Sequence, residues 1–200
     1  MTKSQQLSGL LSFLLLIGTP LTTLAADTSD KPIDPQKSTT GFEIIGSNLQ
    51  FSSFSDFKFE SDKAENIINH EVTLHSIDKE HTLAIQDYRG THEGWTLSAT
   101  MSNVTEKDSG RTIKQPTLTL NPTLSTADSQ KLAPNKNIRL TPTTTQPVLN
   151  VAENSGEGNT QLSFTNTTIT IPKQYDISAG TYTADLKWTL APITKVDTAQ

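Results

Sequence analysis

The chain has 200 residues, 16 Lys and Arg against 21 Asp and Glu, a formal net charge of −5 and no cysteine. An acidic surface does not suit nucleic acid or anionic lipid, so we expect neither as a partner. The absence of cysteine excludes disulfides, a lipid anchor on cysteine, and metal sites or nucleophiles built on thiolates.

Residues 1–26 have the layout of a secretory signal peptide. Lys3 precedes the apolar run from Leu10 to Ile17, and Ala25 and Ala26 are the small residues expected near a cleavage site. The run is shorter than the roughly 20 residues that a spanning helix needs, so we predict export with cleavage and no transmembrane anchor. Cleavage would remove one base and no acid, leaving 15 bases, 21 acids and a net charge of −6.

The rest of the chain divides into a leader and a domain. Residues 27–41, rich in Pro, Ser, Thr and Asp, predict a flexible polar leader, and residues 42–200 predict one domain. Within the domain the apolar residues alternate with period two, which predicts an all-β, single β-sandwich or jelly-roll-like domain with at most one or two short helices. The predicted strands are residues 48–51, 82–87, 95–104, 116–120, 148–152, 161–164, 167–171 and 182–190. The two candidate helices are residues 64–69 and a segment near 127–132.

The C-terminal residues 191–200 contain no Leu-Pro-x-Thr-Gly sorting signal, hydrophobic tail or basic stop. An exported chain without an anchor either diffuses away or is held by binding. We therefore expect the protein at the cell surface, with partial release to the medium.

Catalytic and metal-binding signatures are missing from the sequence. It contains no Gly-x-Ser-x-Gly elbow, phosphate loop or His-Glu-x-x-His motif. Glu71, Asp78 and Glu80 lie close together, but their segment is polar throughout, which favours solvated charge over paired catalytic carboxylates. The four histidines have spacings that match no ligand pattern: His70, His75, His81 and His92. We predict no catalytic residue, no metal and no cofactor.

One short motif occurs twice. Trp95-Thr96-Leu97 is repeated as Trp188-Thr189-Leu190, and these hold the only two tryptophans of the chain. In a strand, residues two apart share a face, so each copy displays an indole beside a leucine. The second copy ends a longer alternation in which Tyr182 and Leu186 face the same way.

The surroundings of the two copies resemble a known family. Asp87-x-Arg89-Gly90 followed by Gly94-Trp95-Thr96-Leu97 resembles the proximal motif of the WxL domain, and Gly180-x-Tyr182-Thr183-Ala184-x-Leu186-x-Trp188-Thr189-Leu190 resembles the distal motif. The Gly-rich residues 154–159 also resemble the family, so the resemblance covers most of residues 41–194. It implies a non-catalytic surface protein of Gram-positive bacteria that binds peptidoglycan or an associated wall glycan without a covalent bond. It also implies a neighbour on the surface, a WxL-interacting protein.

Two functional hypotheses remain open for the repeated motif. In the first, the domain contacts the wall through aromatic platforms and polar groups; in the second, the same apolar strip docks a partner protein. The predicted binding residues are Trp95, Leu97, Tyr182, Trp188 and Leu190. Each indole could instead be a core residue, as tryptophans on the apolar side of a strand often are. We also predict that an early strand pairs with the last strand and brings the two motifs together.

A second group of residues is expected to support the first motif. It comprises Asp87, Arg89, Gly90 and Gly94, and the distal motif adds Leu186. Asp87 and Arg89 are two apart on a strand, so we predict a surface ion pair of little energetic value whose role is to orient the turn before Trp95.

Overall fold

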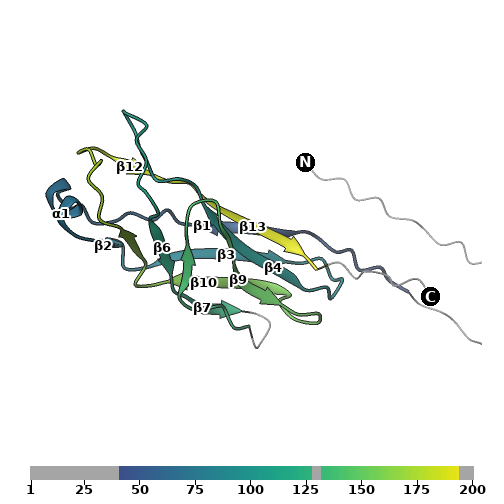
Figure 1. Cartoon of the computed structure of the whole chain (residues 1–200). Coiled ribbons are helices and arrows are strands. Elements are labelled where there is room, and N and C mark those ends of the chain that lie inside the picture. The colour runs from purple at the N-terminus through teal and green to yellow at the C-terminus, as the bar shows by residue number, and fades with distance from the viewer. Residues whose placement is uncertain (1–40, 128–131, 194–200) are drawn as a thin grey trace, which may run out of the picture. The chain divides into compact units, whose positions relative to one another are not determined.

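Strands dominate the computed structural model, which describes residues 41–127 and 132–193. From Glu43 onward the chain forms one unit, Glu43–Gln200, and all that follows concerns that unit. Its described part contains one short helix and thirteen strands, which appear in Figure 1 in chain order. These elements are β1 (Leu49–Phe54), α1 (Ala64–Asn69), β2 (Val72–His75), β3 (His81–Asp87), β4 (Trp95–Met101), β5 (Thr105–Glu106), β6 (Thr117–Leu120), β7 (Pro122–Ala127), β8 (Ile138–Leu140), β9 (Thr145–Val151), β10 (Gly158–Phe164), β11 (Thr168–Ile171), β12 (Tyr182–Thr183) and β13 (Leu186–Pro192).

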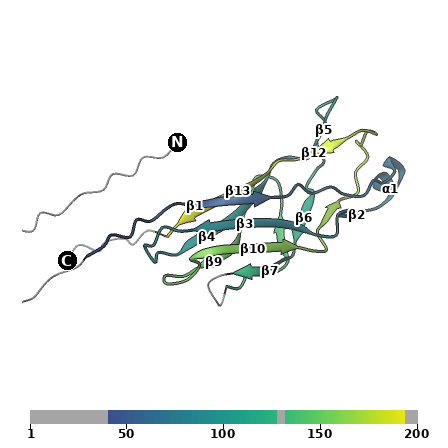
Figure 2. The same ribbon diagram turned by 180° about the vertical axis from the view of Figure 1, so that it is seen from behind.

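The strands form four antiparallel sheets. The β3 sheet has the order β1-β3-β10-β7, the β4 sheet has the order β13-β4-β9, and the β11 sheet has the order β2-β11-β6-β8. β12 pairs only with the short β5. The edge strands β1 and β13 of two different sheets lie side by side, as both views of the ribbon show (Figures 1 and 2).

Alternating burial explains why these segments are strands. β3 and β4 are each buried at every second position, so one face of each strand enters the core while the other stays half exposed. Leu83 and Ile85 of β3 and Leu97 of β4 are at most 1% exposed and belong to one hydrophobic cluster. The ring of Phe164 on β10 lies 5.4 Å from that of Trp188 on β13, which joins the β3 sheet to the β4 sheet. The all-β prediction is confirmed.

Each of the eight predicted strands overlaps a strand of the structure, but the last one is divided. The chain leaves the strand conformation at Ala184 and Asp185, because Tyr182 and Thr183 pair with β5 whereas Leu186 onward pairs with β4. The helix predicted at 64–69 is confirmed as α1. The helix suggested near 127–132 falls mostly outside the described residues, and Ala127 itself ends strand β7.

Strands β2, β5, β7 and β8 were not predicted. β7 begins at Pro122, in an Asn-Pro pair that predicts a break, yet proline is tolerated as the first residue of an edge strand, and β7 is an edge strand. β5 and β8 are too short, at two and three residues, for an alternation to be recognised.

Across residues 41–127 and 132–193, no helix has the length and apolar character that crossing a membrane would require.

Candidate functional site

The two Trp-Thr-Leu motifs lie on neighbouring strands. β4 and β13 are antiparallel, and the register places Leu97 opposite Leu190. Trp95 lies opposite Pro192 and Trp188 opposite Ala99, so the indoles flank the leucine pair on opposite sides. The predicted pairing of an early strand with the last one is therefore confirmed.

The register also separates the two indoles. Trp188 pairs with Ala99, which is four residues beyond Trp95 on β4. The two tryptophans are therefore offset by about 13 Å along the strands. Each tryptophan is instead diagonal to the leucine of the other motif, within reach of a large side chain. The motifs thus cover each other's leucine rather than joining their indoles into one platform.

Trp95 and Leu97 belong to the interior of the domain. Both are 0% exposed, and the indole N–H of Trp95 donates to the carbonyl oxygen of Gly156 at 3.4 Å. Gly156 has φ +81°, and a Cβ there would lie 2.7 Å from Nε1 of Trp95 and 2.5 Å from a methyl of Val151. The Gly-rich segment after β9 therefore closes over the indole because it carries no side chain there. In this conformation neither Trp95 nor Leu97 offers its side chain to a ligand.

The turn before Trp95 is held by a buried ion pair. Nε and Nη2 of Arg89 donate to the two carboxylate oxygens of Asp87 at 2.9 and 2.8 Å, and Nη2 also donates to the carbonyl oxygen of Glu93 at 2.9 Å. Asp87 is 3% exposed and the Arg89 side chain 13%, so the predicted surface pair is wrong in its location. The reason is that Asp87 occupies an inward position of β3, whereas Arg89 lies beyond the strand end and folds back over it. The hydrogen bond from Arg89 to Asp87 raises the pKa of the guanidinium.

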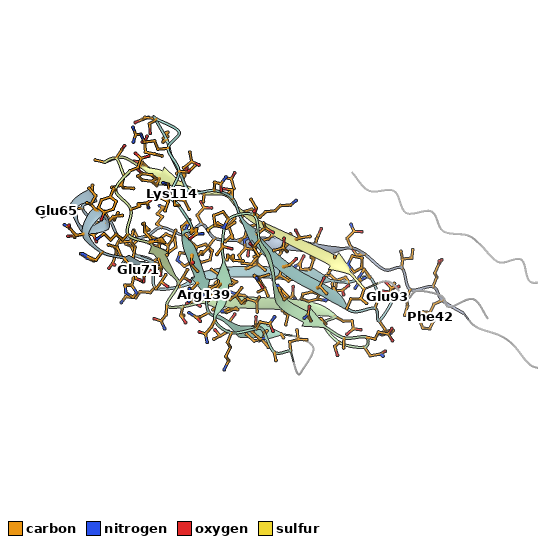
Figure 3. The ribbon with its side chains drawn as sticks, viewed as in Figure 1. Phe42, Glu65, Glu71, Glu93, Lys114 and Arg139 are labelled. Carbon is orange, nitrogen blue, oxygen red and sulfur yellow. The ribbon has the colours of Figure 1, made fainter. Side chains whose placement is uncertain are left out.

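Two glycines shape the same turn. Gly90 has φ +68°, a left-handed conformation that glycine adopts without strain. A Cβ on Gly94 would lie 2.1 Å from the carbonyl oxygen of Val151, so glycine alone lets the start of β4 approach β9 this closely. Figure 3 places Glu93, in this turn, at the end of the strands opposite Glu65 of α1.

The distal motif reaches the surface at a groove. Trp188, Leu186 and Tyr182 are partly buried against the core and line a hollow of about 510 Å³. One side of the groove is the segment that continues β1, residues 54–59, and the other is the segment that leads into β13. The deeper apolar lining comprises Phe57, Met101, Val104, Leu118, Ile169 and Leu186.

Aromatic rings connect the groove to the core. Phe57 lies 4.2 Å from the ring of His81 and meets Phe164 edge-on at 5.8 Å, and Phe164 in turn contacts Trp188. The hydroxyl of Tyr182 donates to the carbonyl oxygen of Ser178 at 3.0 Å, which fixes that ring at the groove wall. Trp188 is therefore held in place from beneath.

Polar groups stand along the rim of the groove. Asp56, Lys58 and Asp185 line it and are exposed, with Ser55 and Thr183 beside them. Phe54, 68% exposed, adds an apolar surface at the same rim. The arrangement combines an apolar floor with charges of both signs at its edge, as binding sites for amphipathic ligands do.

The sequence profile of the family described as WxL domain surface cell wall-binding matches residues 19–193. The chain belongs to the WxL domain family. The match extends upstream of residue 42, where the domain was predicted to begin. No curated protein matches the chain. Membership gives this WxL domain a wall-binding role at the cell surface.

The groove of the WxL domain contains residues that sequence reasoning missed. Phe54, Asp56, Phe57 and Lys58 were not predicted, because the strand there was expected to end at Phe51. A signal was present: phenylalanine recurs at positions 51, 54, 57 and 59, on a segment otherwise polar. Of the predicted binding residues, Tyr182 and Trp188 line the groove, whereas Leu190 is partly buried opposite Leu97.

Histidines and carboxylates of the WxL domain do not gather into a metal site. Within the part of the chain that the structure describes, no three His, Asp or Glu side chains lie close enough to hold one ion. His81 is 2% exposed, and its Nε2 lies 2.6 Å from the Ser76 hydroxyl beneath Phe57, so it serves packing. His92 pairs with Glu157 at 3.0 Å on the surface.

Proposed function

We propose that this WxL domain attaches the protein without a covalent bond to the peptidoglycan of a Gram-positive wall, and that the groove is the contact site. The observation that carries the proposal is the position of Trp188 and Tyr182 in the wall of an open, partly apolar groove. The wall-binding description of the family supports the same reading. The protein would be exported, retained on the wall by this contact and partly released.

The two motifs would then have different roles. Trp95, fully buried, would hold the fold, and Trp188 would take part in binding. Binding rather than catalysis is the proposed activity, because the rim charges Asp56, Lys58 and Asp185 are exposed to solvent, whereas catalytic groups are typically partly buried beside a specific charged partner.

Sedimentation with purified peptidoglycan sacculi, stripped of protein, tests the proposal. The protein should sediment saturably, and Phe54→Ser should weaken binding roughly tenfold, because one aromatic contact contributes about 1–1.5 kcal/mol. Phe54 is exposed enough that the change leaves the fold intact. Tyr175→Ser is the matched control, since Tyr175 is 76% exposed and does not line the groove. Equal weakening by both variants, or no sedimentation, contradicts the proposal.

A second function is docking of a partner protein, such as a WxL-interacting surface protein, in the same groove. It is favoured by the edge strands β1 and β13, whose outer edges pair with no other described strand and suit pairing with a protein strand. Binding to untreated cells but not to stripped sacculi would support this alternative.

A further inference from the structure

We infer that the groove recognises the short peptides of peptidoglycan rather than its amino-sugar strands. The inference rests on the proposed function and names the part of the wall polymer that is bound. These peptides are extended, carry small methyl-bearing side chains and one diamino acid, and end in a carboxylate. The sugar strands carry hydroxyl and amide groups all around their rings.

The position of the groove between two strand edges suits an extended peptide. β1 and β13 are each at the edge of a sheet, and among the described strands none pairs with their outer edges. An antiparallel edge strand directs alternate N–H and C=O groups outward. The end of β1, at Phe54, and the start of β13, at Leu186, both line the groove, so a peptide lying along it meets the ends of both edge strands. Backbone groups of Ser55, Lys58 and Asp185, farther along its walls, already bond within the domain.

The apolar floor favours methyl groups over sugar hydroxyls. Met101, Leu118, Ile169 and Leu186 offer no hydrogen-bonding side chain, and burying a hydroxyl or amide without a partner is unfavourable. The ring of Trp188, which could stack on a sugar, is partly buried and in contact with Phe164. A peptide can place methyl side chains on this floor and keep its backbone paired at the groove walls.

The rim charges match the ends of such a peptide. Asp56 and Asp185 are two carboxylates that can receive the ammonium of a diamino acid, and Lys58 can receive the terminal carboxylate. Exposed charges contribute little affinity each, but they fix the direction in which a ligand lies. The groove thus offers both partners that a zwitterionic peptide needs, whereas a strand of N-acetylated amino sugars has no cation for the two carboxylates.

The deciding experiment compares intact sacculi with sacculi whose peptides have been removed by an amidase that cuts between the sugar and the peptide. Both are first coupled to beads through their sugar hydroxyls, so that the glycan strands stay on the solid phase when the cross-linking peptides are lost. We expect saturable binding to intact sacculi, and binding about tenfold weaker or lost after amidase treatment. Equal binding to both overturns the inference and leaves the proposed function standing. Binding to neither form contradicts the proposed function itself, and the inference with it.

A second measurement uses the synthetic stem peptide alone. Because Trp95 is fully buried, a change in tryptophan emission on titration reports Trp188, and a Trp188→Phe variant identifies the signal. Lys58→Glu should weaken peptide binding roughly tenfold through loss of an attraction and gain of a repulsion. Lys114→Glu, the same charge change at an exposed residue outside the groove, should leave it unaltered. A peptide that neither changes the emission nor competes for sacculi, or equal effects of the two lysine variants, overturns the inference.

Discussion

Replacing Trp95 by alanine removes the largest fully buried side chain of the described domain. Truncation of a buried tryptophan costs about 3–5 kcal/mol, most of it from lost transfer free energy and the cavity left behind. The hydrogen bond to Gly156 is long, at 3.4 Å, and adds only about 0.5 kcal/mol. Since domains are stable by about 5–15 kcal/mol, the variant should lose roughly a fifth or more of its stability. For a domain of this size the melting temperature should fall by about 6–20 °C.

Trp188→Ala provides the comparison within the same sheet. Trp188 is only partly buried, so the loss should be smaller, about 1–3 kcal/mol, while wall binding falls. Thermal and urea unfolding followed by far-UV circular dichroism measure both variants. Our assignment of Trp95 to the core would be refuted if Trp95→Ala melted within about 2 °C of the natural chain or above Trp188→Ala.

Four other predictions concern stability, processing and attachment. Arg89→Leu should destabilise by about 3–5 kcal/mol in urea because it leaves the Asp87 carboxylate buried without its partner, and the double variant with Asp87→Leu should recover part of this loss; no recovery would argue against the pair. Hydrogen bonds, the largest from the Ser109 hydroxyl, lower the folded pKa of Glu106 below 4.5, so its contribution is present above that pH and disappears as the pH falls. Between about pH 5 and about pH 3 the melting temperature of the natural chain should therefore fall further than that of Glu106→Gln. An equal fall in both proteins would contradict this. Mass spectrometry of the surface protein should find a terminus at Ala26 or Asp27 rather than Met1. Concentrated chaotropes should release the protein from cells without wall digestion, whereas retention through boiling detergent would indicate a covalent bond.

The fold could be predicted from the sequence because alternation is a local property. Strands such as β3 and β4 bury every second residue, and their side chains alternate in the same way along the sequence. The division of the last predicted strand at Asp185 could not be predicted. It depends on which strand lies alongside: the N–H of Ser102 donates to the carbonyl of Asp185 at the point where β4 ends. Pairing between residues so far apart in sequence leaves no local signal.

The candidate site was predicted only in part. The repeated motif identified Trp188, but identical tripeptides gave no reason to expect Trp95 in the core and Trp188 at a groove. That difference arises from position in the sheet. β4 is the central strand and pairs with a neighbouring strand at each edge, whereas β13 is an edge strand and pairs only with β4 among the described strands. The opposite wall of the groove comes from residues 54–59, where the recurring phenylalanines were the only signal and did not show that the segment faces β13.

On the proposed function, the pairing of β4 with β13 also couples binding to completion of the fold. β13 places Leu190 against Leu97 in the sheet and supplies Leu186 and Trp188 to the groove, so one strand serves the core and the site together. Its partner lies about ninety residues earlier in the chain, a separation that makes this contact slow to form. The groove can therefore exist only after the last strand has joined the sheet, and a chain that has not finished folding would have no site with which to hold the wall.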